Sequence, residues 1–104
     1  MIVEERDYRL HPGKLKTYLD LYAAEGMAVQ KQILGNMLGY FFTDIGELQH
    51  VVHLWGYETY AERERRRAEL GRNPVWLAYT GKMLPLVQTM TSRILIPTAF
   101  SPIA

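Results

Sequence analysis

The segment from Gly39 to Tyr57 constrains the fold most strongly, because its second half alternates between two kinds of side chain. Successive residues of a β-strand point to opposite faces of a sheet. One face would carry Val51, His53, Trp55 and Tyr57, and the other Val52, Leu54 and Gly56. The histidine-bearing face is too apolar for water and too polar for an ordinary closed core. We therefore predict a hairpin over 37–45 and 49–58 whose histidine-bearing face is covered by a second copy of the chain.

Spacing and capping residues predict the remaining elements. Residues 2–10 are expected to form a strand that ends at a His-Pro-Gly turn. Apolar residues recur at helical spacing over 15–33, and Gly35 supplies a stop signal. Thr59 with Glu62 forms a capping box that predicts a helix over 60–70, and Asn73 with Pro74 predicts the start of another. Residues 92–97 predict a last strand, followed by an apolar tail over 98–104.

The order strand, helix, strand, strand, helix, strand indicates a single α+β domain over 1–104 of the ferredoxin-like, split βαβ type. Right-handed crossovers place the helices on one face of a four-stranded antiparallel sheet and leave the other face bare. We assign to the bare face a set of polar and aromatic side chains from three strands: Glu4, Arg6 and Tyr8 from the first, Tyr40, Phe42 and Asp44 or their alternates from the second, and His53, Trp55 and Tyr57 from the third. Such a patch exceeds what soluble monomers expose, so the sequence predicts a homodimer of facing sheets, a dimeric α+β barrel.

Composition excludes several classes of function. The 12 Lys and Arg residues nearly balance 11 Asp and Glu, and a net charge of +1 gives no field that would gather nucleic acid. Cysteine is absent, which removes disulfides, thiol nucleophiles and cysteine-ligated metal centres. The sequence carries neither a signal-peptide pattern nor an apolar run of membrane-spanning length, so we predict a cytoplasmic protein without membrane insertion. The arginine-rich run over 62–69 contains interleaved acids, which is typical of a solvated helix face.

The best catalytic candidates are His53, Arg6, Glu4 and Asp44. The imidazole of His53 could act as a general base, Arg6 could hold an enolate or carboxylate, and Asp44 or Glu4 could orient the imidazole. The alternative is that Glu4 and Arg6 form an ion network that satisfies an otherwise apolar dimer core.

Four aromatic residues could form the walls of a pocket for a small apolar or aromatic ligand, or else belong to the dimer core: Tyr8, Tyr40, Trp55 and Tyr57. His50 and His53 are an odd number of residues apart, which places them on opposite faces of a strand. They therefore cannot chelate one metal ion together, and we predict neither a metal site nor a cofactor.

Several motifs, spread over almost the whole chain, resemble those of a known family. They are Glu4-x-Arg6-x-Tyr8-x-Leu10-x-Pro12-Gly13-Lys14, Leu38-Gly39-Tyr40, Thr43-Asp44-Ile45-Gly46, His50-Val51-Val52-His53-Leu54-Trp55, and Arg93-Ile94-Leu95 with Pro97. This pattern is similar to the NIPSNAP domain. The resemblance implies a dimeric α+β barrel. Animal members of the family are mitochondrial proteins linked to vesicle trafficking and to signalling of damaged mitochondria, whereas the small bacterial members, which this chain resembles, have no established reaction.

Two hypotheses about function follow. The first is a homodimeric barrel protein that binds a small molecule or serves a structural role. The alternative is a cofactor-independent monooxygenase or isomerase acting on an aromatic or quinone-like substrate, as the resemblance to α+β barrel proteins implies. The enzyme requires an open cavity that reaches His53 or Arg6.

Overall fold

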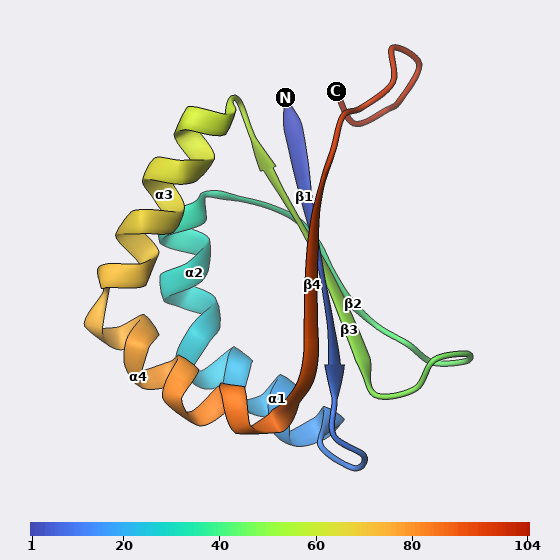
Figure 1. Ribbon diagram of the computed structural model, residues 1–104, viewed down its shortest axis with the longest axis vertical. Helices are drawn as coiled ribbons and strands as arrows, with labels where there is room; N and C mark the ends of the chain where they lie inside the picture. The colour runs from blue at the N-terminus through green and yellow to red at the C-terminus, as the bar shows by residue number, and fades with distance from the viewer.

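The computed structural model describes residues 1–104, and all of its α-helices lie on one face of an antiparallel sheet (Figure 1). The strands are β1 (Ile2–Leu10), β2 (Asn36–Phe42), β3 (His50–Tyr57) and β4 (Val87–Leu95), in the spatial order β2-β3-β1-β4. The helices are α1 (Leu15–Leu21), α2 (Met27–Leu34), α3 (Tyr60–Arg72) and α4 (Pro74–Met83). The predicted element order and the ferredoxin-like α+β class are confirmed.

The first helical region is continuous, as its spacing predicts, but it changes pitch. A π-helical turn, η1 (Tyr22–Gly26), joins α1 to α2, and Gly26 lies so close to the ring of Tyr79 that a Cβ would come within 2.8 Å of it. Gly35 ends α2 with a φ of +89°, a conformation that glycine adopts without steric cost. No helix of the structure combines the length and the apolar character needed to cross a bilayer.

The predicted caps of the second helical region are confirmed. The Thr59 hydroxyl accepts a hydrogen bond from the Glu62 backbone N–H at 3.1 Å, and α3 begins directly after Thr59. The Asn73 side chain accepts from two backbone N–H groups at the start of α4. A 3₁₀ turn, η2 (Leu84–Leu86), then leads into β4, which begins at Val87 rather than at the predicted residue 92.

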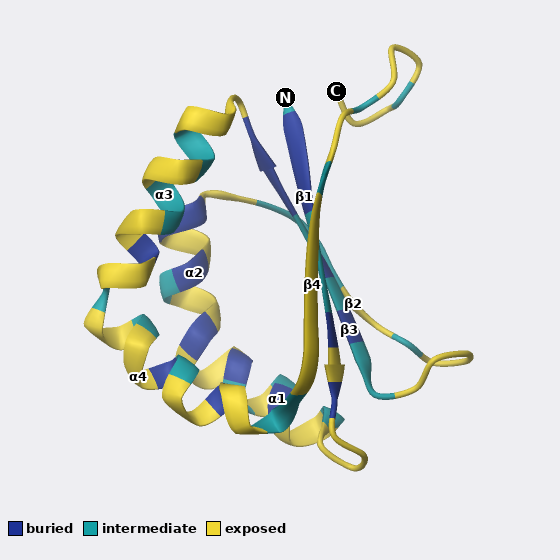
Figure 2. Cartoon of the chain, in the orientation of Figure 1, coloured by how far each residue is buried: buried dark blue, intermediate teal, exposed yellow.

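The prediction that the bare face carries His53, Trp55 and Tyr57 is wrong. These three side chains point toward the helices and are at most 2% exposed. They lie among the two apolar clusters that form the core between sheet and helices. Figure 2 shows that buried residues occur along both β1 and β3. Glu4 and Tyr8 share that face, as predicted, and they too are buried by the chain's own helices.

The inner face of α3 explains why the assignment of faces was reversed. Of the thirteen residues of α3, only Leu70 is buried, and Arg63 and Arg67 lie on the same side of the helix at spacings of seven and three residues from it. A helix face that presents guanidinium groups needs polar partners on the sheet, because a buried charge without a partner is costly. The polar face of the sheet therefore packs beneath α3, and the run over 62–69 is not simply a solvated surface.

The bare face carries the aliphatic side chains of β3 together with charged residues. Val52 and Leu54 lie on it, and Val52 pairs with Phe41 of β2, whose ring covers Gly39. The loop after β2 and the segment after β4 both extend away from the helices on this side of the sheet (Figure 1). The C-terminal segment helps to line an apolar hollow of about 290 Å³ together with Val3, Leu54 and Leu95.

Candidate functional site

The strand register brings a group of polar side chains together under α3. Arg6, on the central strand β1, pairs with His53 of β3 on one side and with Ser92 of β4 on the other. Two residues earlier on the same face, Glu4 pairs with Trp55. Side chains two residues apart on a strand lie on one face, so a carboxylate, a guanidinium and an imidazole meet at the middle of the sheet.

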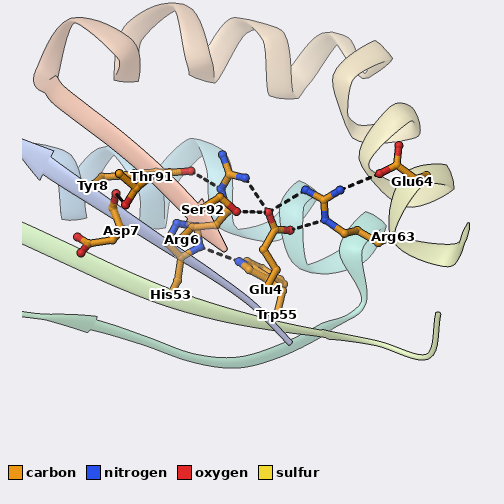
Figure 3. A network of polar contacts seen from close by, with 10 residues as sticks. All are labelled: Glu4, Arg6, Asp7, Tyr8, His53, Trp55, Arg63, Glu64, Thr91 and Ser92. Atoms are coloured by element: carbon orange, nitrogen blue, oxygen red, sulfur yellow. Dashed lines mark hydrogen bonds and ion pairs between the residues drawn. The ribbon is translucent and has the colours of Figure 1, made fainter. Parts of the chain in front are cut away.

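Glu4 is fully buried and is the centre of this group (Figure 3). Its Oε2 accepts hydrogen bonds from Arg6 Nη1 at 2.9 Å, from Arg63 Nη2 at 3.0 Å and from the Ser92 hydroxyl at 2.6 Å. Its Oε1 accepts from Arg63 Nε at 3.1 Å, so Arg63 binds the carboxylate with two donors. Through Glu4, these hydrogen bonds connect Arg63 of α3 with β1 and with Ser92 of β4.

The carboxylate stays ionised despite its burial. Burial by itself would raise the pKa of Glu4, but the hydrogen bonds from Arg63 and Ser92 and the positive charge of Arg6 outweigh it and lower the pKa to about 2. The carboxyl therefore carries a negative charge at every pH at which the protein would ordinarily work.

His53 lies in an aromatic enclosure. Its ring stacks on Tyr40 with centroids 4.4 Å apart, and it meets the rings of Tyr8 and Trp55 edge to face. The Trp55 indole N–H donates to His53 Nδ1 at 2.6 Å, which assigns the proton of the neutral imidazole to Nε2. Burial lowers the pKa of His53, and the charges of Arg6 and Arg67 lower it further, to about 3.

Three polar atoms beside this group are buried and have no hydrogen-bond partner. They are Nε2 of His53, the hydroxyl of Tyr57 and Nη1 of Arg67. Buried polar groups nearly always find partners in folded proteins, and each unpartnered group costs free energy. Nε2 of His53 and Nη1 of Arg67 are donors, and the tyrosine hydroxyl can donate too. Each of these three groups could therefore donate a hydrogen bond to an acceptor atom.

The structure separates one predicted site residue from the rest. Asp44 lies in the exposed loop after β2, because β2 ends at Phe42 and not at the predicted residue 45. Arg6, Glu4 and His53 are brought together, and Tyr8, Tyr40, Trp55 and Tyr57 surround them. Whether any of these residues takes part in catalysis stays a prediction. His50 lies on the bare face, where its Nδ1 pairs with Asp7 at 2.8 Å, so the two histidines do face opposite ways.

Sequence reasoning missed Arg63, Arg67 and Ser92. The sequence does contain a signal for the two arginines. They precede Leu70 by seven and three residues, so they lie on the same side of the helix as this apolar residue, which marks the inner side. Ser92 carried no such signal, since its place depends on how β4 pairs with β1.

The cavities of the structure lie elsewhere. The largest, about 700 Å³, is a groove between α2 and α4 whose lining includes Ala28, Val29, Pro74 and Ala78. None of the four cavities is lined by His53 or Arg6. The open cavity that the enzyme hypothesis requires is therefore not present in this conformation.

Comparison with known proteins identifies relatives along nearly the whole chain. Residues 3–102 match the NIPSNAP family model. The protein NipSnap of Drosophila melanogaster is 35% identical over 101 residues, which cover 97% of this chain and 36% of that protein. The chain thus spans about a third of the length of the curated relatives that it matches.

Solved structures agree with the sequence comparison. A NIPSNAP family protein from Agrobacterium tumefaciens is 47% identical, with a TM-score of 0.97 and coverage of 99% of this chain and 98% of that one. An antibiotic biosynthesis monooxygenase has a TM-score of 0.66 at 14% identity, covering 94% of this chain and 99% of its own. At that identity the second likeness shows a shared fold and nothing further.

Proposed function

We propose that this chain, which belongs to the NIPSNAP family, is a homodimeric protein that binds a small molecule inside each protomer, between α3 and the sheet, when α3 moves outward and opens a cavity that this conformation lacks. The observation that carries the binding proposal is the set of buried, unpartnered polar atoms on His53, Tyr57 and Arg67. A ligand with acceptor atoms would satisfy these groups. A sequence without cysteine also favours a reducing compartment such as the cytoplasm.

Binding fits the properties of the site better than proton transfer does. A general base works best when its pKa lies near the operating pH. The pKa of His53, lowered to about 3 by burial and by the neighbouring arginines, leaves a weak proton acceptor and a good hydrogen-bond donor at Nε2. We therefore favour a binding protein over the alternative of a cofactor-independent oxygenase or isomerase.

The two tryptophans offer a direct test of the binding site. A compound that enters the cluster should shift the indole N–H resonance of Trp55, which is bonded to His53, and leave that of Trp76 on α4 nearly unchanged. A Trp76→Phe variant assigns the two signals. Screening a panel of small neutral and charged molecules by ¹H–¹⁵N spectra measures the effect, and a panel that never moves the Trp55 signal selectively would contradict the proposal.

The bare face of the sheet supports the dimer. Phe41 is 55% exposed, and it lies beside Val52 and Leu54, so an apolar strip runs across two neighbouring strands on the side without helices. Exposed apolar strips of this kind commonly mark interfaces. The second copy would pack on this strip, with the loop after β2 and the C-terminal segment reaching around it (Figure 1). The contact surface thus differs from the one that the sequence predicted, although the partner is the same.

A charge placed on the strip should break the dimer. Leu54→Glu would put a carboxylate beside Glu5, which pairs with it across β1 and β3, and burying that charge against a partner would be costly. We expect the unaltered protein to sediment at twice its 12.1 kDa mass at micromolar concentration and Leu54→Glu to sediment as a monomer. Leu77→Glu, at an exposed leucine of α4, is the matched control and should remain dimeric. A monomeric unaltered protein would rule the dimer out.

A further inference from the structure

The inner side of α3 is charged rather than apolar. Only Leu70 is buried on it, and the four partly buried side chains of the helix are Glu62, Arg63, Arg66 and Arg67. These five positions recur at spacings of three and four residues, so they share one side of the helix. α3 has thirteen residues and buries one, whereas the eight residues of α2 bury three and the ten residues of α4 bury two. Apolar packing therefore holds α3 to the sheet only weakly.

Polar contacts of two arginines hold this side of α3 in place. Arg63 donates from Nε and Nη2 to the two carboxylate oxygens of Glu4, at 3.1 and 3.0 Å (Figure 3). Arg66 donates to the backbone carbonyl of Ile33 in α2 at 3.0 Å. Hydrogen bonds to a charged group contribute more than those between neutral groups, and a forked pair is the stronger arrangement. The Arg63–Glu4 pair is therefore the main polar attachment of α3 to the sheet.

A third arginine opposes the closed position of α3. Nη1 of Arg67 is buried and has no hydrogen-bond partner. A buried donor without an acceptor has lost its hydrogen bonds to water and gained none in exchange, which costs free energy. Outward movement of α3 would return this group to water. The closed position thus carries a cost that opening relieves.

The residues at the two ends of α3 are suited to act as hinges. Thr59 precedes the helix with φ −142° and ψ 164°, and Asn73 follows it with φ −75° and ψ 124°, so both have extended backbone. Residues at the ends of elements commonly absorb the φ and ψ changes of a hinge motion. The Asn73 side chain caps α4, so a rotation at Asn73 can move α3 while the first turn of α4 stays satisfied.

We propose that α3 is a lid over the polar group around Glu4 and that the Arg63–Glu4 pair is the latch that holds it closed. This inference rests on the proposed function and names how access to that site is regulated. Glu4 also accepts hydrogen bonds from Arg6 and Ser92, so it keeps two partners when Arg63 leaves. Opening therefore does not strand the carboxylate without a donor. Because only open molecules bind, the latch lowers the apparent affinity in proportion to the open fraction.

Hydrogen exchange of backbone N–H groups measures the opening. Arg63→Met should speed exchange in α3, beyond its first turn, by roughly ten- to a hundredfold, the effect of losing hydrogen bonds to a charged group. Exchange in α2 and β3 should stay nearly unchanged. Arg63→Lys keeps the charge but not the fork, so its effect should be intermediate. Arg65→Met, at an exposed arginine of the same helix, is the matched control and should exchange as the unaltered protein does.

A neutral quencher tests whether the opening reaches the core. Trp76→Phe leaves the fully buried Trp55 as the only tryptophan. In this background acrylamide should quench the fluorescence of Trp55 more strongly when Arg63→Met is added, but not when Arg65→Met is added. Unchanged quenching would contradict the lid, because an open α3 exposes the core beneath it.

The exchange experiment decides the latch whether or not a ligand is found. Equal exchange in α3 of Arg63→Met and Arg65→Met would overturn it, and so would an acceleration that spreads equally to α2, since that is global unfolding. Panel compounds that shift the Trp55 signal should bind Arg63→Met more tightly by the same factor as exchange increases. A confirmed latch with no such compound rejects small-molecule binding and keeps the lid. Selective binding with unchanged exchange rejects the latch and keeps the binding site.

Discussion

Glu4→Gln is expected to lower the free energy of unfolding by about 3–5 kcal/mol, the range found when one partner of a buried ion pair is removed. The substitution keeps the shape of the side chain but removes the buried negative charge that Arg6 and Arg63 share. The two guanidinium groups would then repel one another in a largely buried place. Urea unfolding at equal protein concentration measures the loss as a lower midpoint at an unchanged slope.

An exposed ion pair provides the control. Lys16 and Asp20 pair at 2.6 Å on α1, with side chains 87% and 66% exposed. Exposed pairs of this kind contribute little, because water already solvates both charges. Asp20→Asn should therefore leave the midpoint unchanged within error. A Glu4→Gln variant that unfolds at the same urea concentration as the control would show that the buried network does not stabilise the fold.

Acid should destabilise the protein through His53 before it affects Glu4. The pKa of His53 is lowered from 6.5 to about 3 in the folded protein, mainly by burial and then by Arg6 and Arg67. The unfolded chain therefore takes up a proton as the pH falls below 6.5, while the folded protein does not, so stability is lost on acidification. Between pH 6.5 and pH 4.5 the loss amounts to about 2 kcal/mol.

The prediction is measured by urea unfolding across that pH range. His53→Gln has no proton to take up, so its free energy of unfolding should vary much less between pH 6.5 and pH 4.5, although the variant is less stable at neutral pH. His11→Gln, altered in an exposed turn outside the cluster, should follow the unaltered protein. The account of His53 would fail if the histidine variant kept the full pH dependence. Below pH 4.5 the protonation of Glu4, whose pKa is about 2, adds a further loss.

Local signals in the sequence predicted most of the fold. Helix ends were predictable from single residues. Thr59 and Asn73 accept hydrogen bonds from backbone N–H groups at the start of a helix, and Gly35 adopts the positive φ that ends one. Alternation along β1 and β3 also grouped Glu4, Tyr8 and His53 correctly on one face. These features depend only on residues that are close together in the chain, so they can be recognised from the sequence alone.

The side of the sheet that the helices cover was not predictable in the same way. A face that carries a histidine between large aromatic side chains looked too polar for an ordinary closed core, because Arg63, which binds Glu4 on that face, lies 59 residues further along the chain. Only the packing of α3 reveals that partner. The predicted length of β2 was too great because apolar Ile45 suggested that the strand continued. The strand in fact ends at Phe42, and the loop that follows carries Asp44 out of the site.

The central position of β1 in the sheet affects how the chain can fold while it is being synthesised. β1 is made before both of the strands to which it is hydrogen-bonded, β3 and β4, and its Val3 pairs with Leu95 of β4. A nascent chain that lacks its last strand therefore leaves β1 with an open edge. Contacts so distant in sequence slow folding, and an unpaired edge invites association with other chains. Synthesis of β4 therefore covers the open edge of β1 and ends this risk of aggregation.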